Sequence, residues 1–338
     1  MPLSNSLFMD IATLPKIELH LHLDCSLSYD VVSTIRSGIT RAEFERDFIA
    51  PPKCPTLADY LTRALKGIAL MQSESELRLV TADLFEQLVR DNVLYVEIRF
   101  APLLHTQNGI GEEHVVEIVD DAVEKGCKKT GVEARLILCT LRHYSAEQSM
   151  RTVKLVERFR GRRVAALDIA GDEAGFPVDA HIPAFQYAIT NNIARTAHAG
   201  EARGAESVWE TLQHFNPSRI GHGVRSIEDK ELIQHLKEAR IHLEICPTSN
   251  VQITPIESYN DHPVDRFYKS GVSVGINTDA RTISNVTLAH EYEVLQRVFG
   301  WRAEHFRVCN VNAIEAAFIP KNLKNQLTDK LLTAYKNL

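Results

Sequence analysis

The feature that most constrains this chain is the recurrence of short, β-branched apolar runs that end in polar or glycine-rich loops. Most runs are followed by a stretch with apolar residues at three-to-four spacing, the period of an amphipathic helix. Strand and helix alternating eight times predict an α/β chain folded as a parallel (β/α)8 barrel, a TIM barrel, rather than an open sheet. The predicted strands are KIELHLH (16–22), YVEIRF (95–100), ARLILCT (134–140), VAALDIA (164–170), ARTAHAG (194–200), RIGHG (219–223), IHLEICP (241–247) and VSVGINTD (272–279).

One connection in this pattern is much longer than the rest. About seventy residues separate the first predicted strand from the second, which is too long for a simple loop. The stretch contains the loop FIAPPKCPTLADY (48–60) and helical patterns at 60–71 and 75–91. We therefore predict a helical insertion over the barrel mouth, spanning roughly residues 25–94. No low-complexity tract or linker divides the chain, so we expect residues 1–338 to form a single domain.

The charge pattern limits the partners of the chain. Hydrophobic residues make up 44% and charged residues 24% of the 338 residues, which is typical of a soluble chain with a large core. The formal charge is −6, and the most basic segment, RFRGRR (158–163), is predicted to be a solvated helix end. Proteins that bind nucleic acid usually carry a basic face, so we expect no nucleic-acid partner.

Cysteine usage and the N-terminus bear on the compartment. The six cysteines include no C-x-x-C pair, which predicts a reduced, cytoplasmic protein without structural disulfides. The N-terminal segment MPLSNSLFMDIATLPK (1–16) lacks the basic and apolar regions of a secretion signal, and no run approaches a membrane-spanning length. We therefore expect no membrane partner. The oligomeric state is left open by this pattern.

Polar residues gather where the predicted strands end. In a barrel of this type, side chains at the carboxyl ends of the strands point into one shared pocket. These positions hold His20, His22 and Asp24 after the first strand, Gly171, Asp172 and Glu173 after the fourth, His198 and Glu201 after the fifth, His222 after the sixth and Asp279 after the eighth.

The residue types in this set are those of a metal site. Residues i and i+2 of a strand face the same side, so His20 and His22 can bind one ion from a single rigid element. With His198 and Asp279 they provide three imidazoles and a carboxylate, the ligand set of an open catalytic zinc site. Iron or another divalent ion could occupy the same ligands. The fourth strand has no lysine near its end to bridge two metals, so we predict one ion, with acid–base residues beside it.

Each of these residues has a simpler structural explanation when taken alone. Two histidines spaced by one residue are often surface or core residues. His198 could cap the next helix, His222 between glycines could be a turn residue, and Asp279 could be a helix N-cap. Their shared position at the same ends of successive predicted strands favours the functional interpretation.

Two further motifs are predicted to be structural. HEYE (290–293) lacks the second histidine of a metalloprotease helix, because Val294 follows it, and is predicted to be ordinary helix surface. CPTSN (246–250) is predicted to be a transition from strand to loop, in which Ser249 has no evident base to activate it.

Together these residues carry a family resemblance. The chain resembles the adenosine deaminase family, the metal-dependent 6-aminopurine deaminases of the amidohydrolase superfamily, from about Pro15 to the last barrel helix. The resemblance implies a (β/α)8 barrel that deaminates adenosine and 2′-deoxyadenosine to the inosine product and ammonia through a zinc-activated hydroxide. The motifs that carry it are HLHLD, AGDEAGFP, TAHAGE, RIGHGVR, CPTSN and NTD, in this order along the chain.

The resemblance also assigns roles to individual residues. It implies that one zinc ion is bound by His20, His22, His198 and Asp279.

It further implies that Glu201 protonates ring nitrogen N1, which requires a raised pKa for this carboxyl. His222 is expected to orient and help deprotonate the attacking water, and to stay charged beside it. Gly171 is expected to donate its backbone N–H to N3, Asp24 to hold a ribose hydroxyl, and His22 to contact substrate as well as metal.

Two positions depart from the family pattern. Most members have a second acid after the metal-binding aspartate, where it contacts purine N7, but Ala280 and then Arg281 stand here. Cys25 follows HLD, where a small residue is usual. A deaminase of adenine or of a modified adenosine is therefore an alternative, and a non-catalytic purine-binding or interaction protein is a third. The P-C-x-x-C ligand motif of cytidine-type deaminases is absent.

Overall fold

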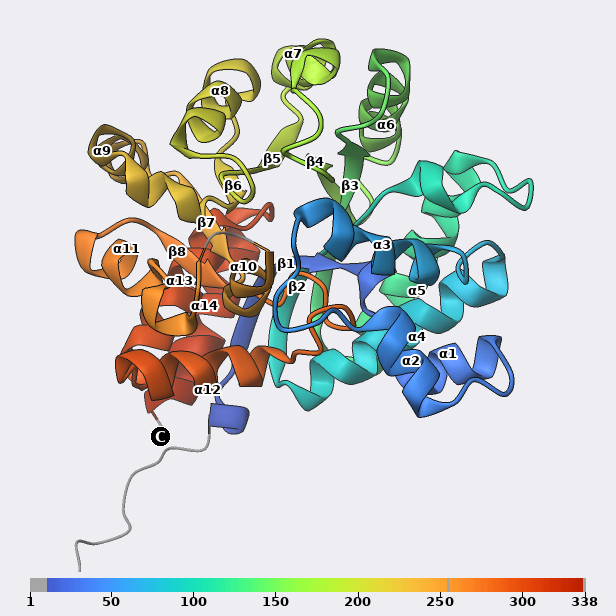
Figure 1. Ribbon diagram of the computed structural model, residues 1–338, viewed down its shortest axis with the longest axis horizontal. Coiled ribbons are helices and arrows are strands. Elements are labelled where there is room, and N and C mark those ends of the chain that lie inside the picture. Colours follow the sequence, from blue (N-terminus) through green and yellow to red (C-terminus); the bar gives the residue numbers. More distant parts are fainter. Residues whose placement is uncertain (1–10, 254–255, 337–338) are drawn as a thin grey trace, which may run out of the picture.

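A closed ring of parallel strands forms the centre of the computed structural model, which describes residues 11–253 and 256–336. The strands pair in chain order from β1 to β8 (Figure 1), which confirms the predicted (β/α)8 barrel. β8 returns to β1 through a bridge between Leu21 and Asp279. The strands are β1 (Lys16–His22), β2 (Val93–Phe100), β3 (Glu133–Leu141), β4 (Val164–Ala170), β5 (Ala194–Ala199), β6 (Arg219–His222), β7 (His242–Ile245) and β8 (Val274–Ile276).

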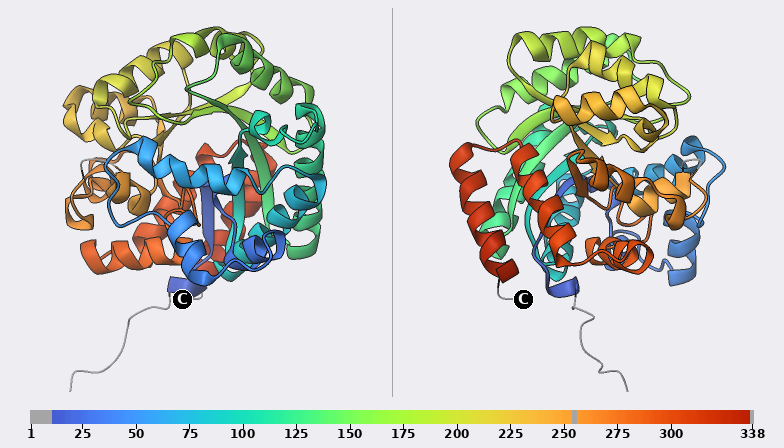
Figure 2. Two further views of the ribbon diagram at one scale, coloured as in Figure 1. Left: turned by 45° about the vertical axis from the view of Figure 1, so that its right-hand side comes forward. Right: turned by 90° about the vertical axis from the view of Figure 1, so that its left-hand side faces the viewer.

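Helices surround the strands on the outside. Figure 2 shows the two C-terminal helices, drawn in red, side by side against the barrel. The helices are α1 (Tyr29–Ile35), α2 (Arg41–Phe48), α3 (Leu57–Ile68), α4 (Glu74–Arg90), α5 (Glu112–Thr130), α6 (Ala146–Arg158), α7 (Ile182–Thr190), α8 (Ala205–Phe215), α9 (Lys230–Glu238), α10 (Pro247–Ile253), α11 (Val264–Ser270), α12 (Leu288–Phe299), α13 (Ala303–Ala316) and α14 (Lys321–Lys336).

The stretch between β1 and β2 carries α1 to α4, of which α3 comes closest to the carboxyl end of β1. Gly67 of α3 allows this approach, because a Cβ built there would lie 2.6 Å from the carbonyl oxygen of Asp24. The side chains of Leu57, Tyr60 and Leu61 on the same helix line a pocket with residues that follow β1 and β8. Helix α3 therefore forms one wall of that pocket.

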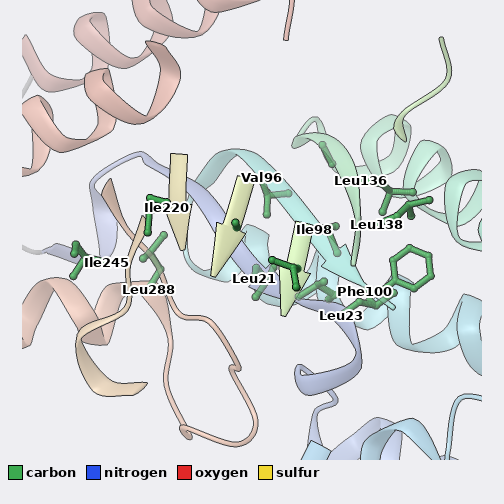
Figure 3. Packing of buried hydrophobic residues seen from close by; sticks show 14 of the residues in the cluster. Leu21, Leu23, Val96, Ile98, Phe100, Leu136, Leu138, Ile220, Ile245 and Leu288 are labelled. Carbon is green, nitrogen blue, oxygen red and sulfur yellow. The ribbon is translucent and has the colours of Figure 1, made fainter. Parts of the chain in front are cut away.

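Strand alternation separates two kinds of buried side chain. Ile17 and Leu19 of β1 pack outward against α13, in one apolar cluster with Ala313. Figure 3 shows apolar residues of β1, β2, β3, β6 and β7 packed in the larger core cluster. Many of the inward positions are polar and buried, and these include Glu18, His20, Glu97, Arg99, Asp168, Thr196, Arg219, Glu244 and Asn277. Burying so many charges is tolerated only when they pair with one another.

Several local predictions can be compared with the structure. The interpretation of HEYE (290–293) as helix surface is wrong, because Glu291 and Tyr292 of α12 are buried. α6 ends at Arg158, an exposed residue, as predicted for RFRGRR. The six cysteines are free and buried, in agreement with the prediction of no disulfides.

Residues 1–10, 254–255 and 337–338 of the predicted domain lie outside the described residues, and these include most of the N-terminal segment on which the expectation of no secretion signal depended. Among the described residues, no helix has the length and apolar character needed to span a membrane.

Candidate active site

Two of the predicted site residues hold an unusual backbone conformation. His222 ends β6 and Asp279 closes the ring beside β1, and each has a φ of 62°. This left-handed region is costly for residues other than glycine, and such conformations cluster at functional sites. Asp279 is fixed there by two backbone hydrogen bonds, because its N–H donates to His20 O at 3.0 Å and its carbonyl accepts from His22 N at 2.8 Å.

The structure brings the predicted metal-binding residues together. One ligand atom each from His20, His198, His222 and Asp279 lies within 4.8 Å of the others. His22 adjoins this group, with its Nε2 3.2 Å from Nε2 of His198 and 3.4 Å from Oδ1 of Asp279. The compact group thus contains His222, which was predicted as an acid–base residue, in addition to predicted ligands.

A second layer of charged residues holds two of these imidazoles and was not predicted. Nδ1 of His20 lies 2.9 Å from Oε2 of Glu244, and Nδ1 of His198 lies 3.1 Å from Oδ2 of Asp168. Arg99 joins the two carboxylates, at 2.8 Å from Asp168 and 2.7 Å from Glu244. Carboxylates on the outer nitrogens of metal-binding histidines fix the ring orientation and direct Nε2 toward the metal.

Small groups complete this centre. Oγ of Ser249 donates a hydrogen bond to Oδ2 of Asp279 at 2.7 Å, so Ser249 supports the carboxylate. Gly221 of β6 leaves space for the rings, because a Cβ there would lie 3.0 Å from Cε1 of His20. A larger residue in the middle of β6 would push the imidazole out of place.

The donor set fits a divalent cation. Nε2 of His20 is buried and has no hydrogen-bond partner, although Oδ1 of Asp279 lies 3.2 Å away. Burial lowers the pKa of His22 to about 3 and also lowers the pKa of His198, so both rings are neutral at pH 7. These two neutral imidazoles, beside an ionised carboxylate, can bind a metal without first losing protons.

Glu201 lies beside this centre as a protonated acid. Burial raises the pKa of its carboxyl well above the ordinary value, and the charge of Asp279 raises it further. Its backbone N–H donates to Oε2 of Glu173 at 2.9 Å, in a loop where the N–H groups of Gly200 and Ala202 donate to the same carboxylate. Glu173, which the sequence placed at the end of the fourth strand, therefore positions the Glu201 loop.

The surroundings of His222 oppose a charge on its ring. Burial and the nearby His20 lower the pKa of His222 well below its usual value, so the imidazole is neutral. Asn250 fixes the tautomer. Its Oδ1 accepts from the backbone N–H of Cys246 at 3.3 Å, which turns Nδ2 toward Nδ1 of His222 at 3.0 Å. The proton of the neutral ring is then on Nε2, which lies 3.4 Å from Oε1 of Glu201.

A pocket opens above these residues. Its volume of about 40 Å³ admits a few water molecules. None of the described residues that line it is a lysine or an arginine. The lining residues are His22, Cys25, Leu57, Tyr60, Leu61, Gly171, His198, Glu201, Asp279 and Ala280.

Of the predicted substrate-binding residues, Gly171 lines the pocket and Asp24 does not. Gly171 lines the pocket with a φ of 98°, a conformation that favours glycine. Asp24 is buried just outside the pocket lining, with Oδ2 3.7 Å from Nε2 of His105 and Oδ1 3.7 Å from Sγ of Cys25. Its pKa is lowered, because the interaction with the nearby His105 outweighs the opposing effect of burial.

The comparison with protein families shows to which family the chain belongs. Residues 15–334 match the family described as "Adenosine deaminase". The chain belongs to the adenosine deaminase family. It is therefore a metal-dependent aminohydrolase, as the strand-end residues and the barrel led us to expect.

Individual relatives agree with this assignment. The chain is 36% identical over 328 residues to an adenosine deaminase of Clostridium acetobutylicum, covering 95% of this chain and 98% of the relative. Among solved structures it is similar to the adenine deaminase of Arthrobacter aurescens, with a TM-score of 0.88, 25% identity, and coverage of 96% and 99%. The N6-methyl-AMP deaminase of Arabidopsis thaliana matches with a TM-score of 0.86, 26% identity, and coverage of 97% and 99%.

Proposed function

We propose that this protein deaminates adenosine and 2′-deoxyadenosine hydrolytically, releasing ammonia and the corresponding inosine. The observation that carries the proposal is the placement of Glu201, whose pKa is raised, 3.4 Å from His222, whose pKa is lowered, directly beside the histidine–aspartate centre. Replacing an aromatic amine by oxygen needs both an activated water and an acid that makes the ring accept electrons. The histidine–aspartate centre can provide the activated water, and Glu201 beside His222 can provide the acid.

We infer that His20, His22, His198 and Asp279 hold one zinc ion. A divalent cation held by these residues would lower the pKa of a water toward about 7 and so supply a nucleophile at neutral pH. Glu244, Asp168 and Ser249 keep the imidazoles and the carboxylate in position for it.

The acid–base steps follow from the protonation states. Glu201 donates its proton to ring nitrogen N1 while water adds at C6. The Nε2–H of His222 donates a hydrogen bond to the attacking oxygen. One proton of that water goes to the leaving amine, which departs as ammonia, and the other returns to Glu201. The product keeps a proton on N1. In this scheme Gly171 donates its backbone N–H to N3, and Asp24 accepts from a ribose hydroxyl.

The pocket favours an uncharged nucleoside over a nucleotide. A phosphate group is usually bound by lysine, arginine or a helix N-terminus, and no cationic side chain lines the described pocket. Although one similar structure is an N6-methyl-AMP deaminase, the proposed substrate here carries no phosphate.

A second candidate is a deaminase of free adenine or of a modified adenosine. Ala280 at the position of the usual second acid favours it, as does the similarity to an adenine deaminase. We also propose that the chain is a single barrel domain and acts in the cytoplasm, since six free, buried thiols suit a reducing compartment.

A panel of aminopurines, followed by the change in ultraviolet absorbance and by ammonia release, tests the proposal. Adenosine and 2′-deoxyadenosine should be deaminated with the highest kcat/KM, and AMP should be a poor substrate. Turnover of adenine without adenosine would favour the second candidate. A protein that binds purines without releasing ammonia from any of them would contradict enzymatic function.

A further inference from the structure

The strand order fixes which edge of the purine faces which wall of the pocket. If adenosine binds with C6 at the metal centre and N1 at Glu201, as the proposed function requires, N7 lies on the other side of C6. Glu201 follows β5, which is four strands from β1 in the ring of eight. Asp279 and Ala280 lie where β8 closes on β1, so N7 faces Ala280 and helix α3.

This side of the pocket is apolar except at one point. Cys25, Leu57, Leu61 and Ala280 provide carbon and sulfur atoms, and none offers a strong hydrogen-bond donor. Tyr60 is the one hydroxyl-bearing side chain among the described lining residues, and its side chain is buried with a residue exposure of 2%.

The Tyr60 hydroxyl is held in place by Ser284. The two oxygens lie 2.7 Å apart. Ser284 is itself fixed next to the reacting centre, because its backbone N–H donates to the carbonyl of Ala280 at 2.9 Å. Ser249 also lies within hydrogen-bonding reach of this hydroxyl. A phenol has one proton to donate and can also accept, so when Ser284 donates to the Tyr60 oxygen, the phenolic proton can turn from Ser249 to an acceptor in the pocket.

We propose that Tyr60 is a specificity-determining residue that donates a hydrogen bond to N7 of the aminopurine, with Ser284 as its positioning residue. The contact replaces the acid that most family members have at the position of Ala280. It requires a substrate with an acceptor nitrogen on the imidazole edge of the ring. A ring with C–H at that position leaves the phenol without a partner, which costs about 1–3 kcal/mol, or about 5- to 150-fold in affinity.

The test compares adenosine with 7-deazaadenosine, in which C–H replaces N7. The wild-type holoenzyme should prefer adenosine in kcat/KM. Tyr60→Phe should lower kcat/KM for adenosine about 10- to 100-fold, while 7-deazaadenosine changes less than about 3-fold, so the preference is largely lost. Ser284→Ala should reduce the same preference by a smaller factor. Tyr187→Phe, which removes a surface hydroxyl bonded to Glu157, serves as the matched control and should change neither substrate.

A rescue variant separates recognition from a general structural role. Adding Ala280→Asp to Tyr60→Phe places a new donor, when protonated, on the same side of the pocket and should restore the preference for adenosine. Equal losses on both substrates in Tyr60→Phe would show that Tyr60 only supports the pocket wall and would overturn the inference, as would an unchanged preference. Failure of the wild type to deaminate adenosine would instead overturn the proposed function, which is a different result.

Discussion

Ser249 donates a hydrogen bond from Oγ to Oδ2 of Asp279 at 2.7 Å, while Oδ1 of that carboxylate lies 3.2 Å from Nε2 of His20. Oδ2 of Asp279 therefore accepts a hydrogen bond from the protein, and Oδ1 faces the histidines of the centre. Ser249 lies in α10 directly after β7, and Asp279 lies beyond β8, so the contact joins two neighbouring strand ends.

Removing this hydroxyl should weaken metal binding. Ser249→Ala leaves Oδ2 of Asp279 without its donor, and supporting contacts of this kind change metal affinity by about 10- to 100-fold. Zinc affinity measured by competition with a chelator should fall by about that factor. Ser270→Ala, which removes a serine hydroxyl bonded to a helix carbonyl in α11, is the control and should leave affinity unchanged. Equal affinities in the two variants would show that the Ser249 contact does not act on the metal.

Glu201→Gln should separate chemistry from metal binding. The amide keeps the shape of the side chain but has no acidic proton for N1, so turnover should fall by about two to four powers of ten. Metal content, measured by mass spectrometry, should remain close to that of the wild type. Glu231→Gln on the surface of α9 should be fully active. Near-normal turnover of Glu201→Gln would remove the residue from its assigned role.

Some parts of the fold and of the site could be predicted from the sequence, and others could not. The eight strands and their polar ends were predictable, because apolar runs that stop at histidine, glycine or aspartate are visible in one dimension. Arg99, Asp168 and Glu244 were missed, although each places a charge inside an apolar strand run. Such a residue must find a buried partner, and that signal would have identified them as candidates for an interior network.

Other features depend on contacts between distant segments. Tyr60 and Ala280 are separated by most of the chain, and only the folded α3 brings them into one pocket. Glu291 looked like helix surface because its neighbours His290 and Glu293 are polar. In the fold, its carboxylate accepts from the backbone N–H of Thr248 at 3.1 Å, which buries it between α12 and α10.

Glu291 should make stability depend on pH. Burial raises the pKa of this carboxyl to about 8, compared with about 4.3 in an unfolded chain. The folded protein therefore keeps a proton that the unfolded chain releases. The contribution is fully present below about pH 4.3 and is lost as the pH rises through about 8. Within this window the free energy of unfolding falls by up to about 1.4 kcal/mol per pH unit.

Glu291→Gln removes this titration while keeping an oxygen that can accept from Thr248. Urea unfolding at about pH 5 and about pH 9 should show a smaller loss of stability in the variant than in the wild type. Glu293→Gln, on the exposed side of the same helix, should keep the wild-type dependence. The same slope in all three proteins would place the titrating group elsewhere.

The close approach of α3 predicts a further effect. Gly67→Ala puts a Cβ 2.6 Å from the carbonyl oxygen of Asp24, so the helix must shift, and the protein should lose about 1–3 kcal/mol of stability. Because α3 carries Leu57 and Tyr60, the shift should also raise KM for adenosine. Gly111→Ala, at the N-cap of α5, meets no atom within 4 Å, so it should cost at most about 1 kcal/mol through the poorer cap and should leave KM unchanged. An unchanged KM in Gly67→Ala would show that α3 does not form the substrate wall.

The most direct test of the whole account is ammonia release from adenosine by protein stripped of metal with a chelator and then titrated with zinc. The account predicts no turnover in the stripped protein and full recovery at one zinc ion per chain, with His20→Ala failing to recover. Undiminished ammonia release from metal-free protein would contradict the account.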